Sequence, residues 1–142
     1  MCYDSNIHFS IIDMMSNVEI IMNFYDYFRK QDQSAYLQLC NDNIEWITMD
    51  GMPNGGKYVG KESVFNDYFP KMLANFEEFH AIPEIFLDSK DYVIVTGRYQ
   101  GVSKRGKNFD VPFSHVYILE NNLILRFRQY TDTEKIQNAL KK

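Results

Sequence analysis

Asp50 is the carboxylate in this chain best placed for acid–base chemistry. It lies two residues beyond Thr48, so the two side chains share one strand face if the strand extends that far. A carboxylate near Trp46 at the mouth of a cavity could have a raised pKa and serve as a general base. The alternative is that Asp50-Gly51 forms a solvated turn at the strand end, which dipeptides of this type favour.

Gln129 and His115 are the other polar candidates. Alternation along the last strand places Gln129 on the inward face with Phe127. There its amide could orient a ligand carbonyl or a water, or could equally bond to the backbone or to Ser114 across the strand. His115, one of three histidines, is expected to face outward with a structural role in an interface.

Other kinds of site have no support in the sequence. No set of histidines and carboxylates has convincing metal-ligand spacing, and no Gly-rich phosphate loop or nucleophile motif occurs. We therefore expect no metal and no cofactor.

Composition narrows the class of protein. The 142 residues are 45% hydrophobic and 15% aromatic, which fits one globular domain with a bulky core or an aromatic-lined cavity. A net charge of −4 argues against nucleic acid as the main partner, because phosphate binding requires clustered Lys and Arg. No apolar run is long enough to cross a membrane, and the N-terminus lacks a secretory pattern. Cys2 and Cys40 match no zinc or disulfide spacing, so we expect reduced thiols and a cytoplasmic protein.

The first part of the chain has helical periodicity. Residues 1–14 are interpreted as an extension, and 15–142 as the domain. A capping box formed by Ser16 and Glu19 opens the first helix, a short second helix follows Asp32, and a third starts at Lys61 with a kink expected at Pro70. Residues 44–49 read as a strand, and the glycine-rich segment 51–60 reads as a loop.

After Ala74 the apolar period changes from helical to two. Strands are expected at 77–87, 91–101, 109–119 and 123–131, and the short connections at 88–90 and 120–122 predict antiparallel neighbours. Pro83 predicts an edge position or a bulge. Thr131 and Glu134 form a second capping box before a brief last helix, which Asp132 could also cap. Helices followed by strands indicate an α+β fold with helices on one face of an antiparallel sheet.

The strand at 109–119 is apolar on both faces. Phe113, His115 and Tyr117 share one face, whereas Ser114 and Val116 share the other. Helices on one side alone would leave a large apolar patch in water, and such patches usually mark interfaces. We therefore expect a homodimer through the outer face of the sheet.

Short motifs in a fixed order give the chain a family resemblance. They are Phe24-Tyr25 with Asp32, Ile44-Glu45-Trp46, Gly51 with the segment from Gly56 to Gly60, Asp91-Tyr92-Val93, His115-Val116, and Arg126 to Asp132. In order and spacing this pattern resembles SnoaL-like proteins of the nuclear-transport-factor-2-like superfamily. The resemblance implies a cone-shaped α+β fold in which three N-terminal helices pack on a strongly curved antiparallel sheet around an apolar cavity. It also implies dimerisation through the outer sheet face.

The residues needed for one activity of the family, ketosteroid isomerisation, can be compared with the matching positions of this chain. That mechanism needs an Asp base, and a Tyr and a protonated Asp that stabilise an oxyanion. The matching positions are Thr48 for the base, Phe24 for the Tyr and Ser114 for the second Asp. All three are altered, so this activity is not expected.

The sequence therefore predicts a cavity that binds a small, largely apolar molecule. Acid–base chemistry like that of SnoaL-like cyclases, isomerases or hydratases would use Asp50 as the base. The alternative is a non-catalytic binding or dimerisation module. The predicted ligand-binding residues are Tyr25, Trp46, Thr48, Tyr58, Phe65, Phe69, Ser114, Val116, Phe127 and Gln129.

Overall fold

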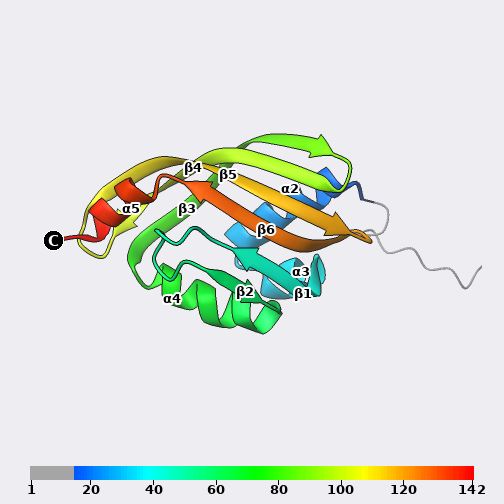
Figure 1. The fold of residues 1–142 in the computed structure, drawn as a ribbon, viewed down its shortest axis with the longest axis horizontal. Coiled ribbons are helices and arrows are strands. Elements are labelled where there is room, and N and C mark those ends of the chain that lie inside the picture. The colour runs from blue at the N-terminus through cyan, green and yellow to red at the C-terminus, as the bar shows by residue number, and fades with distance from the viewer. Residues whose placement is uncertain (1–14) are drawn as a thin grey trace, which may run out of the picture.

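The computed structural model describes residues 15–142, and the extension predicted at 1–14 lies outside the described residues. Its elements are α2 (Asn17–Arg29), α3 (Gln33–Gln38), β1 (Cys40–Ile47), β2 (Lys57–Val59), η1 (Glu62–Tyr68), α4 (Phe69–Leu73), β3 (Phe76–Ser89), β4 (Tyr92–Ser103), β5 (Asn108–Glu120), β6 (Leu123–Thr131) and α5 (Thr133–Leu140). Figure 1 shows the long strands curving over the helices.

The strands form one six-stranded sheet in the order β2-β1-β6-β5-β4-β3. The long hairpins pair antiparallel as predicted, and Asn121 and Asn122 adopt the positive φ values that a tight two-residue hairpin turn needs. The prediction of a purely antiparallel sheet is wrong at one place, because β1 pairs parallel with β6. Local periodicity could not show this, since the pairing joins segments about eighty residues apart in the chain.

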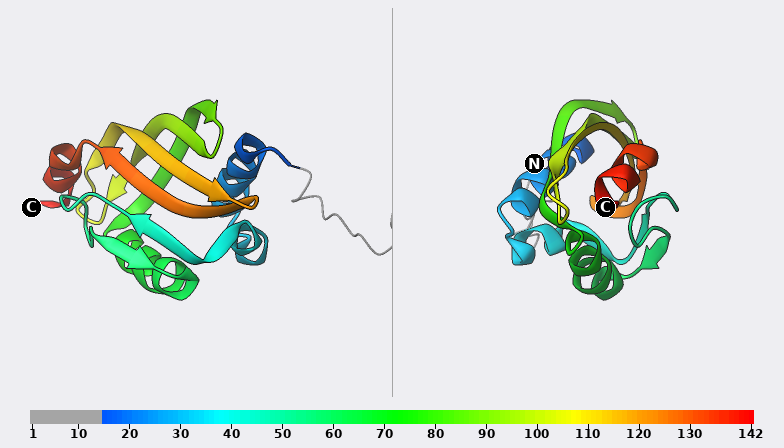
Figure 2. Two further views of the ribbon diagram at one scale, coloured as in Figure 1. Left: turned by 45° about the vertical axis from the view of Figure 1, so that its right-hand side comes forward. Right: turned by 90° about the vertical axis from the view of Figure 1, so that its left-hand side faces the viewer.

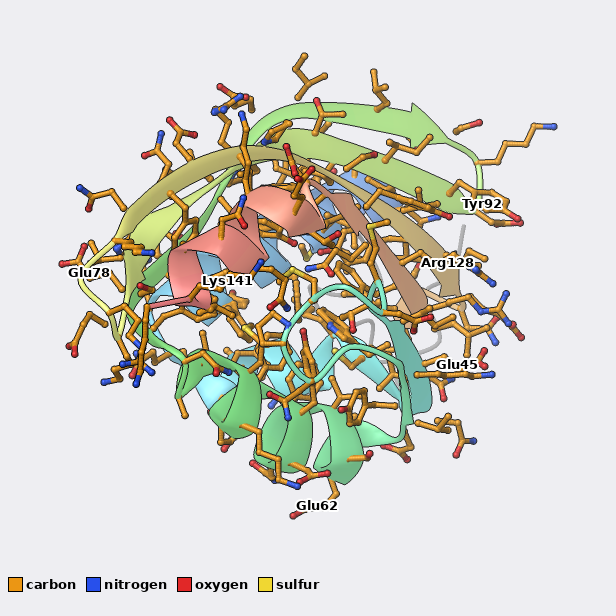
Figure 3. The ribbon with its side chains drawn as sticks, turned by 60° about the vertical axis from the view of Figure 1, so that its left-hand side comes forward. Glu45, Glu62, Glu78, Tyr92, Arg128 and Lys141 are labelled. Atoms are coloured by element: carbon orange, nitrogen blue, oxygen red, sulfur yellow. The ribbon has the colours of Figure 1, made fainter. Side chains whose placement is uncertain are left out.

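The helices cover the concave face of the sheet (Figure 2). Phe24 of α2 contacts the rings of Trp46 on β1, Phe65 on η1 and Tyr117 on β5, which ties α2 and η1 to the sheet. The short helix α5 lies across the end of the cone where β5 begins and β6 ends, as Figures 2 and 3 show. The core therefore lies between the curved sheet and its helices.

The observed helix caps agree with the predicted ones at α2 but not at α5. The Ser16–Glu19 capping box at α2 is confirmed. At α5 the cap is Asp132, which accepts from the Lys135 backbone N–H at 3.1 Å, so the predicted box from Thr131 to Glu134 is wrong. Thr131 belongs to β6, and its hydroxyl donates to the Pro112 carbonyl instead.

Two proline positions shape the elements around them. Pro70 lies in the first turn of α4, where its missing N–H costs little, and the wider π-helical segment η1 precedes it in place of a simple kink. Pro83 lies in β3, an edge strand with a register shift between Pro83 and Ile85, as predicted.

Strand bounds differ from the expected ones at β1 and β2. Strand β1 starts earlier and ends at Ile47, so Thr48 and Met49 fall just after it. The segment expected to be only a loop contains β2, which pairs with β1 and places Tyr58 opposite Trp46.

Gly97 lets the sheet close tightly over the core. A Cβ at this position would lie 2.1 Å from the Ile82 carbonyl oxygen and 2.7 Å from Cζ of Phe113. Only glycine therefore allows β3 to approach β4 while the Phe113 ring packs over the strand.

Candidate functional site

The inward face of β5 carries a buried histidine between aromatic residues. The buried row is Phe109, Val111, Phe113, His115, Tyr117 and Leu119. His115 is 3% exposed, and its ring stacks on Phe113 with centroids 4.0 Å apart. The prediction that His115 faces outward is therefore wrong.

The alternation of side chains along β5 also shows that two predicted ligand-binding residues were placed on the wrong face. Ser114 and Val116 point to the outer face, opposite Tyr130 and Arg128 of β6. Neither can line a space between the helices and the sheet. The physical reason is the two-residue period of a strand, because an alignment error of one residue moves a side chain to the other face. His115 occupies the inward position expected for Ser114.

Both ring nitrogens of His115 contact phenol oxygens. Its Nδ1 lies 2.5 Å from the Tyr25 hydroxyl, and its Nε2 contacts the Tyr99 hydroxyl. The Tyr117 hydroxyl donates to the Tyr25 oxygen at 2.9 Å, and the Gln129 amide nitrogen donates to the Tyr99 oxygen at 2.8 Å. We call these five residues the His115 cluster.

Burial controls the protonation of this cluster. Desolvation lowers the pKa of His115 well below its ordinary value, so the imidazole is neutral near pH 7. Desolvation raises the pKa values of Tyr25, Tyr99 and Tyr117, so all three phenols keep their protons. The cluster is therefore an uncharged set of hydrogen-bond donors and acceptors.

Gln129 anchors the cluster to the loop after β1. It is 6% exposed, as predicted for an inward residue, and its carbonyl oxygen accepts from the Met49 backbone N–H at 3.4 Å. It bonds to Tyr99, not to Ser114. Thr48 is also buried, and its hydroxyl accepts from the Gly56 N–H at 3.1 Å.

Aromatic rings pack beside this cluster. Trp46 and Phe127 stack with centroids 3.7 Å apart, and Phe65 and Phe69 contact Trp46 at 5.8 and 5.3 Å. These four predicted wall residues come together as expected. Tyr58 lies further out, where it packs on Tyr68 and donates to the Asn54 carbonyl at 2.7 Å.

Asp50 does not join these residues. It is exposed, in a turn after the end of β1, and the neighbouring Gly51 packs against Thr133 of α5. The solvated-turn alternative therefore describes its position. No metal-ligating group of three His, Cys, Asp or Glu residues occurs within residues 15–142, and no helix there is long and apolar enough to span a membrane.

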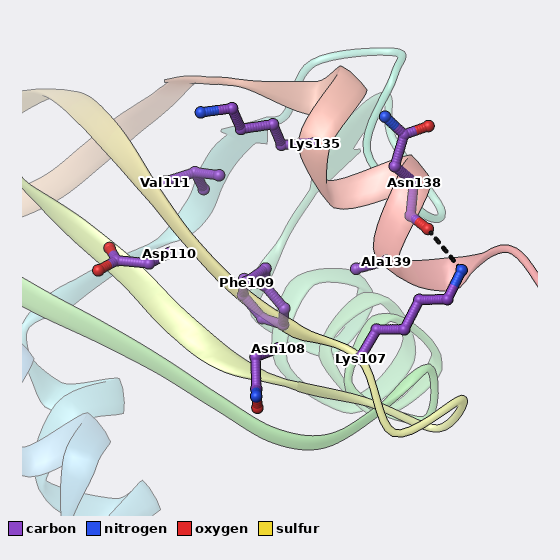
Figure 4. A pocket seen from close by; sticks show the side chains of 8 residues that line it. All are labelled: Lys107, Asn108, Phe109, Asp110, Val111, Lys135, Asn138 and Ala139. Atoms are coloured by element: carbon purple, nitrogen blue, oxygen red, sulfur yellow. Dashed lines mark hydrogen bonds between the residues drawn. The ribbon is translucent and has the colours of Figure 1, made fainter.

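A cleft of about 330 Å³ opens between α5 and β5 (Figure 4). Its lining residues are Lys107, Asn108, Phe109, Asp110, Val111, Lys135, Asn138 and Ala139. Val111 pairs with Tyr99 across β4 and β5, so the floor of the cleft adjoins the strand position of Tyr99. The cleft thus lies at the α5 end of the row that contains His115.

Sequence reasoning missed Tyr99 and misjudged His115. Tyr99, Gly97 and Val95 alternate on β4 with polar residues, and this pattern could have placed Tyr99 on the inward face. Its contact with His115 depends on the register between β4 and β5, which cannot be read from the local sequence.

The fold and the site define a helix-covered curved-sheet protein with a polar cluster in an aromatic interior. The chain belongs to the SnoaL-like domain family, whose sequence profile matches residues 21–127, and so to the nuclear-transport-factor-2-like superfamily. No curated protein matches the chain significantly.

Solved structures share the fold over nearly their whole length. An NTF2-like protein from Burkholderia thailandensis is 26% identical with a TM-score of 0.85, covering 90% of this chain and 99% of that one. TerC co-crystallised with polyporic acid is 22% identical with a TM-score of 0.82, covering 89% and 98%. A putative SnoaL-like polyketide cyclase from Jannaschia is 20% identical with a TM-score of 0.73, covering 95% and 97%.

Proposed function

We propose that the chain binds a small, largely apolar molecule between its helices and its curved sheet, with an oxygen-bearing end at the His115 cluster. The observation that carries this proposal is the buried imidazole of His115, bonded on both nitrogens to phenols. Burying polar groups costs free energy unless they bond well, and an apolar core of similar volume would avoid that cost. A ligand-binding role would explain why polar side chains are buried here in place of apolar ones.

The chemistry of the cluster fits this ligand class. Phenol O–H groups, a neutral imidazole and an amide can polarise a carbonyl or hold an enol, while the surrounding rings contact the apolar body. His115 also replaces Asp50 as our candidate acid–base group, because Asp50 is exposed and lies outside the cluster. Proton transfer at a bound carbonyl compound is the reaction type that His115 best supports.

The route for a ligand is the cleft between α5 and β5. Two of its lining residues, Phe109 and Val111, belong to the same inward row as His115. Trp46 and Phe127 are stacked and buried in the interior, so a ligand must also displace aromatic side chains. Helix α5 holds the end of the cone through the Gln137 amide, which donates to the Gly51 carbonyl at 2.8 Å.

Two relatives agree with this ligand class. TerC was co-crystallised with polyporic acid, and the Jannaschia structure is described as a putative polyketide cyclase. Both are distant, so they support the class of ligand and leave its identity to experiment.

The second candidate function is a dimerisation or interaction module. Ile85, Leu87, Tyr92 and Tyr130 are about half exposed on the outer face of the sheet or at its rim. Val116 pairs with Ile94 in the middle of that face, and Arg128 beside it points outward (Figure 3). We propose that a second copy of the chain covers this face.

A matched pair of ligands tests the main proposal. Indanone carries a ketone on an apolar bicyclic frame, and indane is the same frame without the oxygen; polyporic acid serves as a third probe. We expect calorimetry to show tighter binding of indanone than of indane, and Gln129→Leu to reduce that difference. Equal affinities for indanone and indane, or no binding of any probe to a folded protein, would contradict the proposal.

A further inference from the structure

In the His115 cluster, one phenol hydrogen has no acceptor among the five side chains. A neutral imidazole has one N–H and one bare nitrogen, so one of Tyr25 and Tyr99 must donate to His115 while the other accepts from it. Tyr117 and Gln129 supply donors to these two phenol oxygens from the outside. The tyrosine that accepts from His115 therefore keeps its own O–H for another acceptor. Tyr25 has the Tyr117 oxygen 2.9 Å away, whereas the hydrogen bonds among residues 15–142 supply no acceptor for Tyr99.

The tautomer of His115 decides which tyrosine holds this hydrogen. With the proton on Nε2, His115 donates to Tyr99, and the spare O–H is on Tyr99. With the proton on Nδ1, His115 donates to Tyr25, Tyr25 can donate in turn to the Tyr117 oxygen, and the spare O–H is then on Tyr117. Because the pKa of His115 is lowered by burial, a doubly protonated ring does not compete near pH 7.

The surroundings of the two tyrosines differ. The Tyr25 ring lies among the rings of Phe24, Phe86 and Tyr117, and Tyr117 already bonds to its oxygen. Tyr99 lies beside the Gln129 amide, whose nitrogen donates to the Tyr99 oxygen and has a second hydrogen. A spare O–H at Tyr99 therefore lies beside a second donor, the Gln129 amide, and an acceptor oxygen from a ligand would satisfy both.

Tyr99 is also the cluster member nearest the cleft by strand register. Tyr99 is opposite Val111, which lines the cleft, whereas His115 lies four residues further along β5. At about 3.3 Å a residue, that step is roughly 13 Å along the strand. The Tyr99 side chain spans this step, because its backbone is opposite Val111 while its hydroxyl contacts His115 Nε2, and it therefore connects the cleft with the cluster.

We propose that Tyr99 and Gln129 together donate to one oxygen of the ligand, and that His115 sets this arrangement by carrying its proton on Nε2. The ligand is then a carbonyl or quinone compound, which accepts two hydrogen bonds at one oxygen. Tyr25 and Tyr117 are positioning residues, because they bond to Nδ1 or to each other. This assignment rests on the proposed function for its ligand, but the tautomer is a property of the protein alone.

The first experiment reads the tautomer without any ligand. Long-range ¹⁵N–¹H correlation spectra of the folded protein at pH 7 distinguish Nε2–H from Nδ1–H and from the doubly protonated ring. We expect Nε2–H for His115 in the wild type and a change to Nδ1–H in Tyr99→Phe, since Phe removes the acceptor at Nε2. A wild-type Nδ1–H or charged ring, or an unchanged tautomer in folded Tyr99→Phe, would overturn the assignment. If Tyr99→Phe does not fold, the wild-type spectrum alone decides.

The second experiment measures indanone and indane binding in the same proteins. Tyr99→Phe should weaken indanone about tenfold, the effect of about 1.4 kcal/mol, without changing indane. Tyr25→Phe should weaken it less, and Tyr130→Phe on the outer face serves as the matched Tyr-to-Phe control. A larger loss in Tyr25→Phe than in Tyr99→Phe would overturn the choice of donor. If the tautomer is as expected but no probe binds, the proposed function fails and the tautomer assignment stands.

Discussion

The rings of Tyr25 and His115 lie parallel, with an interplanar angle of 2° and centroids 6.0 Å apart, and the Tyr25 hydroxyl contacts Nδ1 at 2.5 Å. This contact joins α2 to β5 through residues ninety positions apart in the chain. It fixes the imidazole plane, so that Nε2 meets Tyr99 on the opposite side of the ring. Helix packing and the polar cluster are thus linked at one side chain.

Stability should fall as pH decreases from 7 toward 5.5. Burial lowers the pKa of His115 in the folded chain, whereas the unfolded chain titrates near 6.5, so the unfolded state binds more protons in this range. One such group contributes a slope of up to about 1.4 kcal/mol per pH unit. Urea unfolding at several pH values measures it. His115→Leu should remove this contribution and exposed His80→Gln should retain it; identical slopes in all three proteins would contradict the assignment.

Phe127→Ala should lower the free energy of unfolding by about 3–5 kcal/mol. Phe127 is 2% exposed and stacked on Trp46, so its truncation leaves a cavity in packed surroundings. Denaturant unfolding at pH 7 measures the loss, and Phe127→Leu, which keeps most of the volume, should lose much less. A loss below about 1 kcal/mol for Phe127→Ala would mean that the ring borders open space.

Val116→Arg should convert a dimer into a monomer. Val116 is on the outer face between Ile94 and Arg128, so an arginine would place two like charges side by side in the interface. Sedimentation equilibrium at micromolar concentration compares it with Val59→Arg, an exposed valine on β2 away from that part of the face. A wild-type monomer at this concentration would remove the proposed interface.

Asp50→Asn should leave indanone affinity within about twofold of the wild type across pH 5–8, because the carboxylate is exposed and outside the cluster. Calorimetric titration at the ends of this pH range checks it. A loss of indanone affinity of tenfold or more would show that Asp50 contributes to the binding site.

The sequence predicted the elements well because their signals are local. The Ser16–Glu19 box, the alternation in β3 to β6 and the Asn121-Asn122 turn each depend on neighbouring residues. The parallel pairing of β1 with β6 was missed, since it depends on chain segments far apart in sequence.

The site was predicted less well, for the same reason. Gln129 and Phe127 were placed correctly on the inward face from strand alternation; Gln129 belongs to the cluster, and Phe127 stacks on Trp46 beside it. The faces of His115 and Ser114 were exchanged by an alignment error of one position, the smallest error that reverses a strand side chain.

The central claim is that the His115 cluster receives a ligand oxygen, and ligand-induced chemical-shift changes test it most directly. With indanone added to ¹⁵N- and ¹³C-labelled protein, we predict the largest changes at the rings of His115 and Tyr99 and at the Gln129 amide. Changes confined to the outer face around Val116 and Tyr130, or to Lys107 and Lys135 at the cleft rim, would contradict the claim.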